Sequence, residues 1–572
     1  MKHKNNEPHS TNCIIFLQSA KPSIFEPKIE RMELRKWHLA LLASLSGLLL
    51  AFSWPTKGFP GLLFIAWVPL FFIEQYFFEH KDRNGNWSLF IWVYLAFFIW
   101  NALTTWWIWN STKVGSIAAI ILNSLFMAIV FNLYHITRRK LRQGQQFSWL
   151  ILFYWPAWEF LHLNWDFSWP WLSLGNGFAS HIQWIQWYEY TGILGGTFWV
   201  LFSNLLIFIL LKNIFARTIS PLGISVIGVI IVLWIAIPLV FSFQRYKNYS
   251  EQGTTAEVVI VQPNLDPWNE QFEMPVEEVL RRSLDLVLPL IDSSVDFLVA
   301  PESAIQENIW QNHPWNAQSI QLLREFVAQH PHLSILIGAS TFRKFEPGEP
   351  LSSTARKFTD GSGYYDAYNT ALVIDTADEL GYYHKSKLVP GPEKLPFPKI
   401  TRPLQEVVLN FGGTTGSLAT SSERMVFSHK KIGARFNAAI CYESVYGEFM
   451  TGFIRNGSQL ICVMTNDGWW GNTEGHRQHL TFSSLRAIET RRCVVRAANT
   501  GISCFVNQKG DILQPIPYWT QGAIKGQVHL NNELTFYAKY GDYIGRISVL
   551  VSILFLLLTL SYGLMKKGKL KS

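Results

Sequence analysis

Eight apolar runs constrain the fold of this 572-residue chain more than any other feature. Because a helix needs about 20 mainly apolar residues to cross a bilayer, we interpret each run as a candidate span. The fifth is the weakest, since it is short and contains Glu159. The runs are 37–54, 60–78, 87–109, 115–136, 147–163, 192–212, 222–243 and 546–564. Together they predict a multi-span α-helical membrane domain, with seven spans early in the chain and one near its end.

The positions of lysine and arginine predict the orientation of these spans, because such residues concentrate in cytoplasmic loops. With the N-terminus inside, the inner loops and the tail hold most of the basic residues. The outer loops hold only Lys57 and Lys113, and stretch 164–191 holds none; Arg245 and Lys247 oppose the trend. The inner residues are Lys81, Arg83, Arg138, Arg139, Lys140, Arg142, Lys212, Arg217, Lys566, Lys567, Lys569 and Lys571. Both termini are therefore predicted to be cytoplasmic, with residues 251–540 on the outer side.

The same pattern predicts how the chain divides. Residues 1–31 lack the apolar core of a signal peptide, and we expect either a disordered extension or a start assigned too early. A seven-span domain over 32–245 follows, and then an extramembrane domain over 251–540. A last span over 546–564 and a basic cytoplasmic tail over 565–572 end the chain.

Composition and cysteine spacing argue against nucleic-acid binding and against a metal, a cofactor or a disulfide framework. Charged residues make up 16% of the chain, against about 25% in soluble proteins, which fits a mixture of membrane and soluble parts. The net charge of +8 is spread over loops and ends, so nucleic-acid binding has little support. The cysteines show neither CxxC spacing nor a Cys/His metal pattern, so we expect no disulfide framework, metal or cofactor. They are Cys13, Cys441, Cys462, Cys493 and Cys504, and most are predicted to be small buried residues.

Short apolar runs alternate with helical patterns from residue 257 onward, which predicts a layered α/β domain. In such sheets, functional groups gather where strands end. The run "LVAPES" ends at Glu302, "GYYHKSKLVP" carries Lys385 and Lys387, and "NAAICYES" carries Cys441. A glutamate could take the thiol proton, and a lysine could stabilise the thiolate and an oxyanion. Taken singly, each residue has an ordinary structural interpretation, as a buried strand cysteine, a turn glutamate or a solvated lysine.

The short motifs around these residues resemble those of a known family. "PES" at 301–303, "HKSKLVP" followed by "PEK", "CYES" at 441–444 and "TNDGWWG" at 465–471 resemble the carbon–nitrogen hydrolase (nitrilase) superfamily. The resemblance implies a Glu-Lys-Cys triad on an αββα sandwich. With seven spans before it and one after, the domain is similar to the membrane-embedded branch, the apolipoprotein N-acyltransferases. "VQPNLDPW" and "RAIETRRCVVRAANTGIS" resemble the first and last segments of that domain. The resemblance covers about 37–564.

This resemblance implies roles for particular residues. Glu302, Lys385 and Cys441 match the triad, whereas Lys387 falls at a position that varies in the family. One departure concerns the active-site loop, where Gly391-Pro392 replaces the usual Phe-Gly before the glutamate. Supporting or substrate-binding positions are matched by Glu393, Tyr442, Glu443 and Trp268, the last of these near the acyl pocket.

The implied function is the last step of bacterial lipoprotein maturation. A fatty acyl chain would pass from a phospholipid donor to a Cys441 thioester, and then to the N-terminal amine of a diacylglyceryl-cysteine on an apolipoprotein. The enzyme would be a monomer among membrane lipids, in the bacterial inner membrane with its catalytic domain in the periplasm. Two alternatives stay open, a membrane-tethered nitrilase-type amidase and a transporter with an outer binding domain. Eight spans exceed what a tether needs, and few intramembrane charges mark a transport path.

Three further segments carry expectations about function. The Trp-rich stretch 164–191 is either an interfacial aromatic belt or a wall beside a lipid-facing site. Loop 390–418 is long enough to be a membrane-touching gate. In "GHRQHL", two histidines three residues apart lack a third metal ligand, so His479 is expected to be structural.

Overall fold

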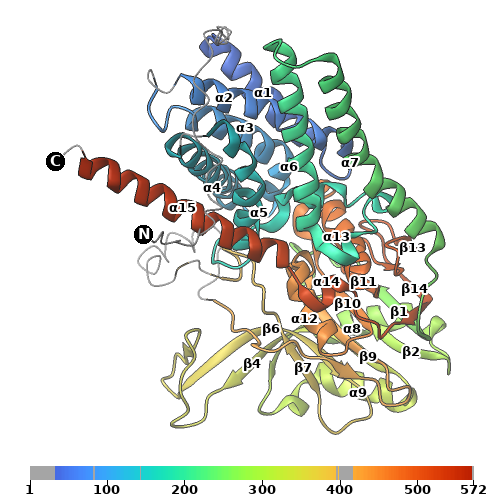
Figure 1. Ribbon diagram of the computed structural model, residues 1–572. Coiled ribbons are helices and arrows are strands. Elements are labelled where there is room, and N and C mark those ends of the chain that lie inside the picture. The colour runs from blue at the N-terminus through green and yellow to red at the C-terminus, as the bar shows by residue number, and fades with distance from the viewer. Residues whose placement is uncertain (1–32, 81–83, 142–143, 395–396, 398–416, 570–572) are drawn as a thin grey trace, which may run out of the picture.

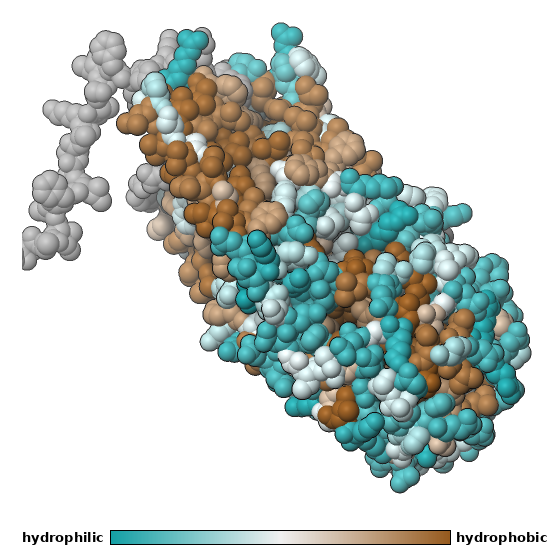
Figure 2. Space-filling model, turned by 90° about the vertical axis from the view of Figure 1, so that its right-hand side faces the viewer, coloured by the Kyte–Doolittle hydropathy of each residue, from teal (hydrophilic) through white to brown (hydrophobic). Residues whose placement is uncertain are grey.

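The computed structural model describes residues 33–80, 84–141, 144–394, 397 and 417–569. A helical part and a β-sandwich follow one another along the molecule, and helix α15 returns from the sandwich to the helices (Figure 1). On the face in view in Figure 2, apolar side chains cover most of the helical part and polar ones predominate on the sandwich. The predicted extension 1–31 and most of the gate loop 390–418 lie outside the described residues.

The helical part contains eight α-helices within the described ranges. They are α1 (Lys36–Phe52), α2 (Val68–Glu79), α3 (Phe90–Thr105), α4 (Lys113–Lys140), α5 (Ile151–His162), α6 (Tyr188–Phe215), α7 (Pro221–Asn248) and α15 (Tyr543–Lys569). Helix α15 packs against α5 so closely that a methyl group at Gly545 would lie 2.6 Å from Cβ of Phe160. The predicted eighth span therefore joins the bundle beside the fifth.

Six helical segments of the described chain are long and apolar enough to cross a membrane. They are Pro60–Glu79, Phe90–Asn110, Lys113–Lys140, Tyr188–Phe215, Pro221–Asn248 and Tyr543–Met565. Helix α1 is apolar but has 17 residues, and the fifth predicted span consists of a 3-10 segment followed by the 12-residue α5. Length thus separates two of the eight predicted spans from the rest.

Helix α5 differs because protein, rather than lipid, surrounds much of it. Glu159 is buried and accepts hydrogen bonds from Trp155 Nε1 (2.9 Å), the Leu174 amide (2.8 Å) and Thr197 Oγ1 (2.6 Å). The carboxylate and its three donors thereby satisfy one another's hydrogen-bonding capacity away from water. The apolar residues of this run belong to the interior of the bundle, which hydropathy alone does not distinguish from a lipid-facing helix.

The extramembrane part consists of two sheets. The first has the order β14-β1-β2-β4-β6-β5, with β3 paired to β4 and β7 to β6. Its strands are β1 (Thr254–Gln262), β2 (Val295–Val299), β3 (Ile305–Trp310), β4 (Ser334–Lys344), β5 (Arg356–Lys357), β6 (Tyr364–Ile374), β7 (Gly381–His384) and β14 (Gly522–Leu530). The second sheet has the order β13-β12-β11-β10-β9-β8. Its strands are β8 (Phe427–Ser428), β9 (Arg435–Ile440), β10 (Leu460–Thr465), β11 (Cys493–Ala498), β12 (Cys504–Val506) and β13 (Ile512–Leu513).

Side-chain alternation shows that the sheets pack face to face. Val258 and Ile260 of β1 belong to the core shared with the second sheet, and the Phe297 and Phe436 rings meet across it at 5.0 Å. Val259 of β1 points the other way, into a core beneath α8 (Val276–Val287) and α9 (Gln318–Gln329). Helices α12 (Gly447–Arg455) and α13 (Glu474–Thr490) accompany the second sheet. The predicted αββα sandwich is confirmed.

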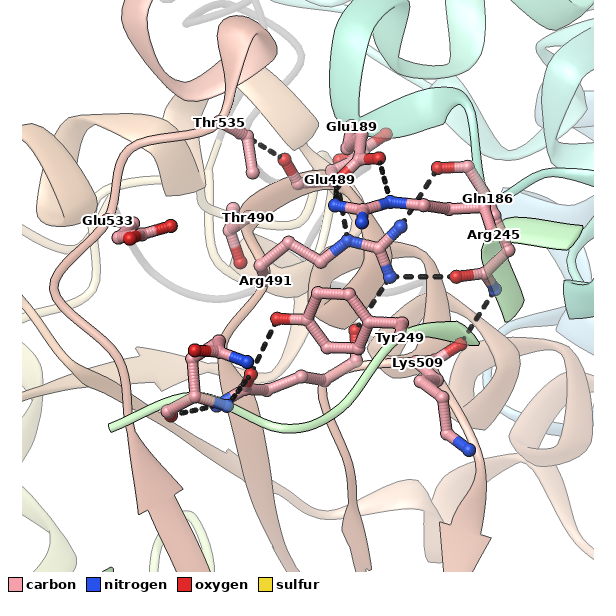
Figure 3. Close-up of polar contacts among 12 residues, drawn as sticks. Gln186, Glu189, Arg245, Tyr249, Glu489, Thr490, Arg491, Lys509, Glu533 and Thr535 are labelled. Atoms are coloured by element: carbon pink, nitrogen blue, oxygen red, sulfur yellow. Dashed lines mark hydrogen bonds and ion pairs between the residues drawn. The ribbon is translucent and has the colours of Figure 1, made fainter. Parts of the chain in front are cut away.

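A charged cluster joins the helical part to the sandwich (Figure 3). Arg491, directly after α13, donates Nε to Glu189 Oε2 at 2.7 Å and Nη1 to Gln186 Oε1 at 2.7 Å. Arg245 of α7 donates Nε to the other oxygen of Glu189 at 2.7 Å, and the Tyr249 ring lies 4.5 Å from the Arg491 guanidinium. Arg245 opposes the charge trend of the loops because it is the partner of a carboxylate at this junction.

Candidate active site

Charged side chains from separate strand ends form one buried cluster. Nζ of Lys385, directly after β7, lies 2.9 Å from Oε1 of Glu302 and 2.7 Å from Oε1 of Glu393. Asn369 of β6 donates Nδ2 to Glu302 Oε1 at 2.8 Å, and its carbonyl accepts the Lys385 amide at 2.8 Å. Glu302 and Lys385 are 6% and 1% exposed, so one lysine bridges two carboxylates away from water.

Electrostatics keeps this lysine charged. Burial alone would lower the pKa of Lys385, but the carboxylates of Glu302 and Glu393 raise it well above its usual range. The thiol of Cys441 behaves in the opposite way. Burial raises the pKa of Cys441, and Glu302 raises it further, whereas Lys385 lowers it. The resting pair is thus a neutral thiol beside a cationic amine, and the thiol needs a base before it can attack.

Cys441 occupies a sharp turn between β9 and a short 3-10 segment, Cys441–Val445. Its φ of +51° is in the left-handed region, which costs a non-glycine residue roughly 1–2 kcal/mol. Glu443 secures the turn. One oxygen of Glu443 accepts the Ile440 amide at 2.7 Å, and the other accepts the Ser386 amide at 2.6 Å and Tyr383 Oη at 2.7 Å. This buried carboxylate therefore ties the cysteine turn to the segment that carries Lys385.

A second buried network lies on the other side of Cys441. Nε2 of His479, from α13, lies 3.2 Å from the carbonyl oxygen of Cys441 and 3.1 Å from Ser444 Oγ. Its Nδ1 lies 2.9 Å from Asp467 Oδ1, and Arg496 donates Nη2 to Asp467 Oδ2 at 2.6 Å. Burial alone would raise the pKa of Asp467, but Arg496 and His479 lower it. The carboxylate thus holds the histidine against the main chain of Cys441.

Cys441, Asp467 and His479 each have one potential metal-ligating atom within 4.8 Å of the others. The hydrogen bonds above engage both oxygens of Asp467, and Thr465 Oγ1 donates to one of them at 2.6 Å. This donor set fits a network that positions the turn better than it fits an open coordination site. His476, the other histidine of the motif, instead stacks on Tyr518 at 4.1 Å.

An apolar cavity of about 330 Å³ opens beside Cys441. Spans and sandwich both contribute to it. Helix α4 supplies Ala118, Leu122 and Phe126, whereas the sandwich supplies Cys441 and Tyr442. Ser168, Trp169 and Trp171 of the Trp-rich stretch, together with residues 389–392, complete most of the wall. The nucleophile therefore faces a space built largely from hydrocarbon and aromatic side chains.

Comparison with known proteins assigns the chain to a family. The model of the apolipoprotein N-acyltransferase N-terminal domain matches residues 46–206, and that of carbon-nitrogen hydrolase matches 258–533. An apolipoprotein N-acyltransferase from Chlorobaculum tepidum is 30% identical over 514 residues, covering 88% of this chain and 93% of the relative. The chain belongs to the apolipoprotein N-acyltransferase family.

Other relatives of this family are more distant. The apolipoprotein N-acyltransferase of Geobacter metallireducens is 27% identical over 517 residues, covering 88% of this chain and 91% of that one. Among solved structures, an amidase from Nesterenkonia sp. is 16% identical with a TM-score of 0.35, covering 52% of this chain and 97% of that chain. Family membership and six apolar helices identify a multi-pass inner-membrane protein.

Of the other predicted site residues, some lie at the site and one does not. Tyr442 lines the cavity and donates Oη to the Ser168 carbonyl at 2.9 Å. Glu393 lies 2.7 Å from Lys385, so the Gly391-Pro392 sequence noted above does not prevent this contact; Gly391 adopts a φ of +97° in the turn. Trp268 is 56% exposed, packs edge-on against Trp469 at 4.8 Å and does not line the described cavity. Its role at the acyl pocket stays a prediction.

Several residues of this site could not be predicted from the sequence. Asn369 had no motif of its own, although it contacts both Glu302 and Lys385. Asp467 lies within "TNDGWWG" and Arg496 within "CVVRAA", and neither pattern by itself predicts a role for them. The signal available was charge within apolar strands, since an arginine inside "CVVRAA" needs a buried partner. Cys462, Cys493 and Cys504 are buried, as predicted, and Cys13 lies outside the described residues.

Proposed function

We propose that this chain transfers a fatty acyl group from a membrane phospholipid to the α-amine of the diacylglyceryl-cysteine of an apolipoprotein, through a thioester on Cys441. The observation that carries the proposal is the apolar cavity beside this residue. Its wall combines α4, which is among the segments long enough to span the membrane, with the cysteine turn of the sandwich. A cavity of this kind suits a hydrocarbon chain whose ester must reach a nucleophile, and family membership supports the same conclusion.

The first half-reaction follows from the charged cluster. Glu302 takes the proton of the Cys441 thiol, and the thiolate attacks the ester carbonyl of the lipid. The Lys385 ammonium and the main-chain N–H after Cys441 stabilise the oxyanion. As the carbon–oxygen bond breaks, the leaving alkoxide takes the proton from Glu302, so that a lysophospholipid departs and a thioester remains. Glu393 shares the ammonium and helps to keep it charged.

The second half-reaction reverses these roles. The α-amine of the acceptor attacks the thioester carbonyl, and Glu302 accepts the amine proton. The carbon–sulfur bond breaks, the thiolate is reprotonated, and an amide is released. Water would compete as the acceptor, so an apolar surrounding that excludes it favours transfer over hydrolysis.

We further propose the topology and domain limits drawn from the sequence. Both termini are cytoplasmic, residues 251–540 are periplasmic, and 32–245 with 546–564 form the membrane part. The distribution of lysine and arginine supports this orientation. A monomer suffices, because Glu302, Lys385 and Cys441 come from one chain and meet within it.

The test is the intact mass of the Cys441-containing peptide after purified protein is incubated with phospholipid and no acceptor. We expect a fatty-acyl adduct that the Cys441→Ser variant lacks and that a diacylated lipopeptide discharges. An adduct formed from small amides but never from phospholipid would instead support the tethered amidase. Absence of any adduct in the wild-type protein would contradict the thioester mechanism.

A further inference from the structure

A second cavity of about 330 Å³ lies where membrane helices meet the sandwich. Leu163, directly after α5, and Asp542, directly before α15, both line it. The cavity therefore lies at the sandwich-facing ends of these helices, where the proposed topology places the membrane surface. At this level the polar headgroups of lipids replace their hydrocarbon chains.

Positive charge exceeds negative charge in this cavity. Three cations line it, Lys387, Arg424 and Arg455. The cavity has two carboxyl groups. Both oxygens of Glu448 accept hydrogen bonds from Nη1 of Arg546, at 2.8 and 3.0 Å. The other carboxyl, Asp542, accepts Tyr537 Oη at 2.8 Å, and burial raises the pKa of Asp542 to about 7. Little negative charge remains available to the three cations.

None of the three cations forms an ion pair with a carboxylate of the described residues. Arg455 donates to Thr451 Oγ1 and to the Ala538 carbonyl, whereas Lys387 and Arg424 have few partners of any kind. Nζ of Lys387 lies 3.1 Å from the Leu163 carbonyl oxygen and 4.7 Å from the centre of the Tyr446 ring. The Arg424 guanidinium lies 3.7 Å above the Phe449 ring. Its Nη1 is buried and has no hydrogen-bond partner within the described chain, which is uncommon for a buried donor.

The surroundings of both side chains disfavour their charged forms. Burial, together with the nearby charges of Arg424 and Lys394, lowers the pKa of Lys387 to about 8, although Glu443 and Glu448 act in the opposite direction. Burial likewise lowers the pKa of Arg424. An anion between them would relieve the mutual repulsion and accept the unused donor. A planar guanidinium beside an ammonium suits the several oxygens of a phosphate group.

We propose that this cavity is an anion site that binds the phosphate group of a membrane phospholipid. As a site for the acyl donor, it rests on the function proposed above. The two cavities share a wall, because Ser168 of the apolar cavity and Tyr446 of the polar one are hydrogen-bonded through their hydroxyls at 2.7 Å. Lipid phosphate can thus bind beside the space proposed for the acyl chain.

The test measures binding, so that it does not depend on turnover. Full-length Cys441→Ala protein in nanodiscs is offered phosphatidylglycerol and a glucosyl diacylglycerol with the same acyl chains, and bound lipid is counted by native mass spectrometry. We expect a preference for the phosphate-bearing lipid that falls about tenfold in Lys387→Met and in Arg424→Gln, since a charge-assisted contact is lost. Lys387→Arg, which keeps the charge, should retain the preference.

Lys539→Met is the matched control, because this exposed lysine of α14 (Phe536–Tyr540) does not line the cavity. An equal loss of preference in Lys539→Met would overturn the proposal, as would an unchanged preference in both cavity variants. Inorganic phosphate, titrated by calorimetry, distinguishes the sources. Phosphate binding that Lys387→Met abolishes, without any change in lipid preference, would overturn the lipid assignment. If the wild-type protein, which keeps Cys441, forms no thioester, that result would count against the proposed function alone.

Discussion

Two cavities of the same size, about 330 Å³ each, lie on either side of the Ser168–Tyr446 hydrogen bond. One is lined by apolar and aromatic side chains beside Cys441, and the other by charged side chains around Lys387. Two lysines show the same contrast. Lys385 lies between two carboxylates, and these raise its pKa. Lys387, two residues later, has no such partner in the described chain, and its pKa is lowered.

The comparison teaches that burial alone does not decide what a lysine can do. Removing a cation from water disfavours its charge, and only a nearby carboxylate or a bound anion restores it. Lys385 has its compensating charge within the protein, so it is ready to stabilise a transient oxyanion. Lys387 lacks this compensation and is suited to bind an anion from outside.

The largest expected effect separates the two lysines. Lys385→Met should lower the rate of thioester formation by on the order of 10³-fold, since it removes oxyanion stabilisation and leaves two carboxylates unpaired. Lys387→Met should lower it far less at saturating lipid. Single-turnover acylation, followed by mass spectrometry, measures both. Equal losses in the two variants would break the comparison, and a circular-dichroism melt of each checks that the fold survives.

Filling the apolar cavity should have the next largest effect. Ala118→Trp places an indole in the space beside Cys441, and we expect roughly 100-fold slower acylation because a hydrocarbon chain no longer fits. Ile117→Trp is the matched control, since Ile117 is 48% exposed on the same turn of α4 and does not line this cavity. If both variants acylate alike, the chain binds elsewhere.

The network behind Cys441 should contribute less. His479→Gln removes the imidazole that Asp467 holds against the Cys441 carbonyl, and about tenfold slower acylation is expected, as for one lost hydrogen bond to a charged group. Because His479 acts through the main chain, the loss should be similar for every acyl donor. A variant whose loss depends strongly on the headgroup would place His479 in lipid recognition instead. The measurement is kcat and KM for two donors.

The fold class could be predicted from the sequence because it depends on short local patterns of residues. The αββα sandwich is confirmed. The structure also brings Glu302 to 2.9 Å from Lys385, whereas the catalytic roles of these residues stay predictions. The spans were predicted less well. Hydropathy records that run 147–163 is apolar, but tertiary packing around Glu159 decides that α5 is short and covered. A periodicity argument does not contain that information.

The second cavity was beyond prediction for a different reason. Its lining combines Leu163, Lys387, Arg424 and Asp542, which lie far apart in the sequence and carry no shared motif. The resemblance to the family implied no role for Lys387, so its sequence context gave no signal. What distinguishes it is the absence of a described carboxylate partner, and only a three-dimensional arrangement reveals that property.

A change of pH should sharpen the contrast by a few-fold. Burial, Arg424 and Lys394 lower the pKa of Lys387 to about 8, whereas Glu443 and Glu448 raise it. The ammonium is therefore present below pH 8 and is lost above it, so the preference for phosphate-bearing lipid should weaken between pH 7 and pH 9. The nanodisc assay at three pH values measures this. Lys387→Arg should show no such decline, because arginine stays charged.

The last prediction concerns the wall between the cavities. Tyr446→Phe removes the hydroxyl that meets Ser168 Oγ at 2.7 Å but keeps the ring beneath the Lys387 ammonium. One such hydrogen bond contributes about 0.5–1.5 kcal/mol, so a threefold to tenfold change at most is expected. If the wall holds acyl chain and phosphate in register, thioester formation should fall while phosphate preference is kept. If both properties instead stay unchanged, the two cavities act independently, and the phosphate at Lys387 belongs to a lipid other than the one that Cys441 attacks.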